Sequence, residues 1–220
     1  MSGSEGTPPG RPVPRRPAFY SPEAMEAHGG VVLDPAVQSE IAHETAQIIV
    51  HAGRAATDPA VTDRLVRLTD DLGLSTLADL WAPLPAHSLP GALWRLYALR
   101  EWVVRDADGA SRDYEAGHRH ADVLHAITGV AEPPGPIEVK ELADAILRGV
   151  FSGDLDVALA RAGAFCRIVA AGRAHRADWS GAAFDDDEGE AAWLKAAGNM
   201  QVLGQDLETC ARLWRRGDLI

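Results

Sequence analysis

The sequence predicts an all-α fold: a single multi-helix domain, orthogonal or bundle-like, of about seven to eight helices behind a Pro-rich N-terminal arm. Hydrophobic residues make up 46% of the chain, but many of them are alanine, a strong helix former, and runs of the β-branched and aromatic residues that strands favour are sparse. No alternation of period two persists, and no hairpin dipeptide stands between strand-like segments. Helix start and stop signals recur instead.

Residues 1–33 are rich in proline, glycine and serine, a composition typical of a flexible or polyproline-like arm. The arm also carries arginines and aromatic residues, which are candidate contacts with an acidic surface of this chain or of a partner. These candidate partner-binding residues are Arg15, Arg16, Phe19 and Tyr20. The alternative is a tail with no specific partner.

Explicit start signals divide the rest of the chain into helices. Asp34 and Asp58 each precede a proline, the preferred arrangement of an N-cap and a first helical residue. Ser75 and Ser88 are the next N-caps, and Gly73 is placed to end the second helix. The predicted helices are residues 35–53, 59–72, 76–82, 89–106, 109–128, 136–150, 154–173 and 190–216.

Two segments interrupt this series. The proline-rich residues 131–136 are a candidate hinge between two helical halves, but neither half alone looks able to bury a core, so we expect one domain over residues 34–220. Residues 177–190 hold six acidic side chains and no cation, which predicts a solvated acidic loop.

The helix predicted over residues 89–106 is apolar on almost every side and should lie at the centre of the fold. It also carries Arg95 and Arg100, and a cation in a core must either reach solvent or meet a carboxylate. These two arginines therefore mark a candidate buried charged pocket. Glu101 and Arg105, four residues apart, are placed to form an ion pair.

Charge and cysteine content bound the class of protein. The net charge of −11 makes nucleic acid an unfavourable partner, because phosphate binding needs clustered lysine and arginine. Cys166 and Cys210 lack metal-ligand spacing and suggest buried free thiols in a reducing cytoplasm. No secretion signal or membrane-length apolar run is visible, so we expect a cytoplasmic protein. Only two of 21 cations are lysine, a bias typical of high-GC bacterial coding.

Two Glu-x-x-His pairs, Glu40/His43 and Glu115/His118, suggest an alternative function. In helical bundles this spacing lets a carboxylate and an imidazole reach one metal. Two such helices facing each other would supply ligands for Fe, Mn or Zn. The competing interpretation is a solvated polar face with histidines at its edge.

Other functional motifs are weak or absent. The sequence contains no phosphate-binding glycine loop, no nucleophile elbow and no zinc-type cysteine and histidine set. Residues 65–81 have the apolar positions and turn glycine of a helix-turn-helix, but the second helix offers no lysine or arginine for phosphate.

The leading interpretation is a non-catalytic cytoplasmic helical protein of regulatory or adaptor type, without a cofactor. It would act through a protein partner or through self-association as a homo-oligomer. The alternatives are a helical-bundle metalloprotein or metal-dependent enzyme that uses the two Glu-x-x-His pairs, and a helix-turn-helix DNA-binding regulator.

Overall fold

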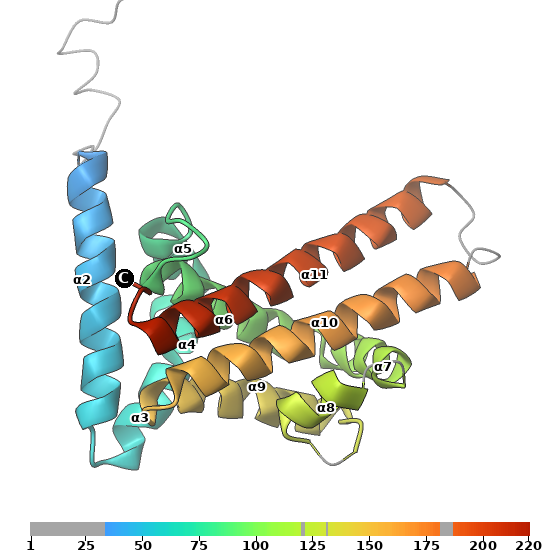
Figure 1. Ribbon diagram of the computed structural model, residues 1–220, viewed down its shortest axis with the longest axis horizontal. Helices are drawn as coiled ribbons and strands as arrows, with labels where there is room; N and C mark the ends of the chain where they lie inside the picture. The colour runs from blue at the N-terminus through green and yellow to red at the C-terminus, as the bar shows by residue number, and fades with distance from the viewer. Residues whose placement is uncertain (1–33, 120–121, 131, 181–186) are drawn as a thin grey trace, which may run out of the picture. The chain divides into compact units, whose positions relative to one another are not determined.

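Helices make up the regular structure of the described residues, and no strand lies among them (Figure 1). The computed structural model describes residues 34–119, 122–130, 132–180 and 187–220. Ten helices lie in these ranges: α2 (Pro35–Ala55), α3 (Pro59–Val66), α4 (Leu68–Leu72), α5 (Leu74–Trp81), α6 (Leu89–Arg105), α7 (Ala107–His118), α8 (Asp122–Thr128), α9 (Pro136–Phe151), α10 (Leu155–Ser180) and α11 (Asp187–Arg216). The all-α prediction is confirmed.

The number of helices exceeds the predicted seven to eight because two predicted helices are each divided. Residues 59–72 form α3 and α4, which are separated at Arg67, where φ is −96° and ψ is 21°. Residues 109–128 correspond to α7 and α8, with α7 ending at His118. Neither break coincides with a proline or a glycine, and so the usual signals of a helix end do not reveal them.

An acidic loop was predicted over residues 177–190, and the prediction is wrong at both ends of this range. Helix α10 continues to Ser180 and α11 begins at Asp187, whereas residues 181–186 lie outside the described part of the chain. The sequence at the start of α11 is acidic, a composition that helix N-termini favour because of the helix dipole. A run of acidic residues therefore does not by itself exclude helix.

The two longest helices, α10 and α11, run side by side in opposite directions (Figure 1). Gly163 and Gly204 let them approach, since a Cβ on either glycine would lie within 2.9 Å of the other glycine's carbonyl oxygen. Arg167 and Glu208 join the same pair of helices by an ion pair of 3.1 Å. This helix pair forms one wall of the core.

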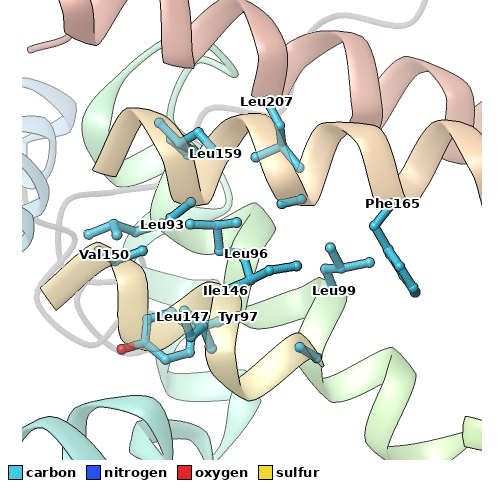
Figure 2. Packing of buried hydrophobic residues seen from close by; sticks show 14 of the residues in the cluster. Leu93, Leu96, Tyr97, Leu99, Ile146, Leu147, Val150, Leu159, Phe165 and Leu207 are labelled. Atoms are coloured by element: carbon cyan, nitrogen blue, oxygen red, sulfur yellow. The ribbon is translucent and has the colours of Figure 1, made fainter. Parts of the chain in front are cut away.

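Helix α6 lies in the middle of the core, as predicted for residues 89–106. It packs against α2, α5, α7, α9, α10 and α11. Figure 2 shows its leucines and Tyr97 among Ile146, Leu147 and Val150 of α9 and side chains of α10 and α11. The hydroxyl of Tyr97 donates to the carbonyl of Leu65 at 2.6 Å. Helix α6 thus joins the segments on both sides of the candidate hinge.

Helices α7 and α10 approach each other more closely than side chains would allow. A Cβ on Gly117 would overlap the carbonyl oxygen of Ile168, and a Cβ on Gly172 would overlap that of Asp113. These two glycines are therefore required by the packing of the two backbones.

The variant Gly172→Ala should lower the free energy of unfolding by about 2–4 kcal/mol, because α7 and α10 must separate to admit the methyl group. Gly198→Ala is the matched control, since Gly198 lies in α11 with nothing within 4 Å of an added Cβ. There the higher helix propensity of alanine should raise stability by up to about 1 kcal/mol. Urea unfolding measures the stability of both variants. If Gly172→Ala stabilised the protein as much as Gly198→Ala, this would contradict the close approach of α7 and α10.

Candidate functional site

The two Glu-x-x-His pairs do not meet in the structure. Glu40 and His43 lie on α2, which packs against α3, α5, α6 and α9, whereas Glu115 and His118 lie on α7, which packs against α6, α8, α9 and α10. His43 donates from Nδ1 to the carbonyl of Ser39 at 2.8 Å, and His118 donates to that of Glu115 at 2.7 Å.

No three His, Cys, Asp or Glu side chains of the described residues form a metal-binding group. The predicted joint site for Fe, Mn or Zn is therefore not assembled in this part of the chain. The i, i+3 spacing brings two side chains of one helix together, but it does not decide which helices face each other.

The helix-turn-helix alternative places its second helix at α5. The apolar residues Leu77 and Trp81 of α5 are buried in the core. The helix contains no arginine or lysine, so its exposed side offers phosphate no cation. The other candidate contacts, Arg15, Arg16, Phe19 and Tyr20, lie outside the described residues.

Arg100 forms a buried charged cluster, as its position in an apolar helix suggested. Its side chain is only 6% exposed, and its Nε donates to Asp144 of α9 at 2.7 Å. Its Nη1 donates to Asp70 at 3.2 Å and to the hydroxyl of Thr69 at 3.3 Å, both on α4. Burial alone would lower the pKa of Arg100, but the hydrogen bonds to Asp144 and Asp70 outweigh it and raise that pKa.

The space beside Arg100 is too small for a ligand. A cavity of about 10 Å³ lies there, lined mainly by apolar side chains of α6 and α9 such as Leu96, Leu142 and Ile146. A volume of this size holds about one water molecule. Arg100 and its carboxylates consequently have a structural role, tying α4 and α9 to α6.

Arg95 lies on a different side of α6, toward α11. Its Nη1 donates to the carbonyl of Gly91 at 3.0 Å, and its Nε lies 3.4 Å from Asp206 of α11. The other carboxylate oxygen of Asp206 is 3.0 Å from Nε2 of His87. The two arginines of the predicted pocket therefore belong to two separate sites, and only Arg95 reaches the surface.

Arg95 and Asp206 border an open groove between α6 and α11, with a volume of about 330 Å³. Leu99 and Met200 are buried in its floor, and Val202 at its edge is 55% exposed. Its remaining lining is mostly apolar: Trp94, Ala98 and Trp102 of α6, and Asn199 and Leu203 of α11. This groove combines concave shape, aromatic surface and a polar end, the usual features of a binding site.

A buried ion cluster fixes one end of the groove. The guanidinium of Arg173 lies 4.8 Å from the ring centre of Trp102, and its Nε donates to Asp113 at 2.8 Å. Arg176 donates to the second oxygen of the same carboxylate at 2.6 Å. Asp113 is almost fully buried, so Trp102 rests on a cation that is itself held in place.

The sequence did not predict the groove, although it contained part of the signal. Trp94, Ala98 and Trp102 recur at intervals of four along one side of α6, and Val202 is an apolar residue that lies outside the buried face of α11. The two helices are about a hundred residues apart, and no local pattern indicates their pairing.

The two cysteines are free thiols inside the protein, as predicted. Burial raises the pKa of Cys166, and burial also raises the pKa of Cys210 to about 11. Because the thiolate is the reactive form, neither group is prepared for nucleophilic attack at neutral pH.

The chain matches no protein-family model, no curated protein and no solved structure. Among the described helices, none combines the length and the apolar character that crossing a membrane requires.

The variant Asp144→Ala should lower the free energy of unfolding by about 2–3 kcal/mol, because it leaves the buried charge of Arg100 with one carboxylate. The double variant Arg100→Met, Asp144→Leu should recover at least half of that loss, since it removes the charge together with its partner. Urea unfolding of the two variants measures this difference. If the double variant is less stable than Asp144→Ala, the Arg100 side chain stabilises the fold by more than the pairing of its charge.

Iodoacetamide at pH 8 should leave both cysteines of the native protein unmodified. With a pKa of about 11, roughly one Cys210 in a thousand is a thiolate at that pH, and burial also blocks access. In guanidinium chloride both cysteines should react, and mass spectrometry gives the number of modified thiols. Rapid labelling of Cys210 in the native protein would contradict its burial.

Proposed function

We propose that this protein is a non-catalytic interaction protein that binds an amphipathic helix of a partner protein in the groove between α6 and α11. One observation carries the proposal: an open groove lined by two tryptophans, Trp94 and Trp102, on the helix at the centre of the core. A regulatory or adaptor role would follow from such binding. The proposal also places the protein in the bacterial cytoplasm, consistent with its free thiols.

The shape of the groove favours a helix as the bound segment. Its walls are two helices whose lining residues recur at intervals of three and four, as in Trp94, Ala98 and Trp102. A third helix can place its own ridge of side chains between two such rows. This mode of recognition uses apolar anchors at i, i+3, i+4 and i+7 of the bound helix.

The two tryptophans supply the contact surface. Tryptophan is enriched among the residues that dominate binding energy, because it offers a large area with few torsions to restrict. Trp102 is held against Arg173, and both tryptophans are already half-buried, so little ordering is required when the partner binds.

Charge indicates the kind of helix that fits. The apolar lining calls for an apolar stripe on the partner, and the net charge of −11 on this chain favours the approach of a basic segment. Asp206 at the end of the groove already pairs with Arg95 and His87, so the groove itself is close to neutral. The fitting partner is therefore a helix with an apolar stripe flanked by lysine or arginine.

Binding of a synthetic leucine and lysine amphipathic helix, measured by isothermal titration calorimetry, tests the proposal. The variant Val202→Arg should raise the Kd at least about tenfold, since it places a charge at the edge of the apolar lining. Val157→Arg is the matched control, because Val157 is exposed on α10 and lies outside the groove lining; it should leave the Kd unchanged.

A scrambled peptide of the same composition serves as the second control. It has the same charge but no apolar stripe, and it should bind at least about tenfold more weakly. Equal binding of the two peptides, or equal effects of the two valine variants, would show charge attraction alone and would exclude the groove as the site.

A further inference from the structure

Helix α2 has apolar residues on two opposite sides. Its inner side, which includes Ala42, Ala46 and Val50, is buried against the core. At 100° per residue a second set lies on the far side: Val37, Ile41 and Ile48, which are 41%, 36% and 57% exposed. An amphipathic helix on a protein surface needs only one apolar side, so the outer stripe is unexplained by the fold.

The outer stripe has the spacing of a helix–helix seam. Val37, Ile41, Ile48 and Ala55 are separated by four, seven and seven residues, which places them at a and d positions of a heptad. Glu44 and His51 occupy the two remaining seam positions, and both are exposed. The stripe therefore runs over the whole length of α2 and fits another helix lying along it.

The ionisable side chains within and beside this stripe are separated by type along the helix. The N-terminal half carries Glu40 and Glu44, and the C-terminal half carries His51 and Arg54. Arg54 is fixed in place: its guanidinium lies 4.9 Å from the ring centre of Trp214 and donates to the carbonyl of Gly153 at 3.3 Å. The N-terminal half of the face is therefore acidic and the C-terminal half carries the cation Arg54, so an antiparallel second copy would place opposite charges beside each other.

We propose that the outer face of α2 binds the same face of a second copy of this chain, with the two helices antiparallel. A two-fold interface needs a surface that is complementary to itself, and this face meets that requirement in charge and in apolar spacing. The heptad register places Glu40 of one copy beside Arg54 of the other, and Ile48 opposite Glu44. A parallel pair would bring like charges together.

This inference stands apart from the proposed function, because no residue of the outer stripe lines the groove between α6 and α11. Glu40, which the sequence placed in a metal site, acquires a different role at the edge of this interface.

The mass of the full chain, measured by light scattering from about 1 to 500 μM, tests the pairing, because a contact between two single helices buries little surface and dissociates in that range. The mass should rise with concentration from 23.5 kDa toward twice that value. The variant Ile48→Glu should lower the association constant at least about tenfold. Its circular dichroism should be unchanged, which confirms that it folds. The control Ile137→Glu, on an exposed residue of α9, should associate as the unchanged chain does.

Disulfide formation tests the direction of the pair. Gln47 lies near the two-fold axis, so Gln47→Cys should cross-link two copies rapidly under mild oxidation. Val37→Cys should not, because in an antiparallel pair the two positions are on the order of 30 Å apart. The native cysteines are buried and do not interfere.

Two results would exclude the antiparallel pairing. One is a mass of 23.5 kDa throughout the concentration range, and the other is equal cross-linking by Val37→Cys and Gln47→Cys, which indicates a parallel pair. A photoreactive group on Ile48→Cys identifies any other occupant: adducts to residues 1–33 of the same chain would assign this face to the arm, and adducts to a different protein would assign it to a partner. Adducts to α2 of a second copy would support the proposal.

Discussion

The positive charge of Arg100 inside the core is the constraint on which the arrangement of the helices depends. A buried cation is tolerated only when carboxylates and hydrogen-bond acceptors surround it. Asp144 and Asp70 meet this need, and they bring α9 and α4 against the same side of α6. At 100° per residue Trp94, Ala98 and Trp102 lie on the opposite side of α6 from Arg100. The pairing of Arg100 with these carboxylates therefore also determines which residues of α6 face α11.

The groove is rigid because its parts belong to the core. Its floor is formed by buried side chains of α6 and α11, and Trp102 rests on Arg173, which Asp113 holds. The carbonyl of Asp113 is also the atom that a side chain at residue 172 would strike, so the close approach of α7 and α10 and the position of Trp102 depend on each other. A surface formed in this way changes little on binding, which favours affinity.

The sequence predicted most of what local chemistry decides and missed what distant packing decides. Among the local signals, the predicted N-cap Ser75 was wrong, since α5 begins at Leu74 and its N-cap is Gly73. The helix starts at Pro35, Pro59, Leu89 and Pro136 follow from N-caps and prolines, and all four agree with the structure. The break at Arg67 has no such signal. The sequence indicated that Arg100 must either reach solvent or meet a carboxylate. It could not decide between these or identify Asp144, since the answer depends on how α6 and α9 pack. The Glu-x-x-His pairs did not converge for the same reason.

Together, the two proposed surfaces would allow bivalent binding, which neither surface allows alone. The α2 face and the groove share no residue, so pairing through α2 would not use the lining of either groove. Two grooves in one assembly convert a second binding event into an intramolecular one, and a partner with two suitable helices would bind far more tightly than either helix alone. Each helical contact can then be modest. The small apolar seam of α2 and the shallow groove are both consistent with binding that depends on several weak contacts acting together.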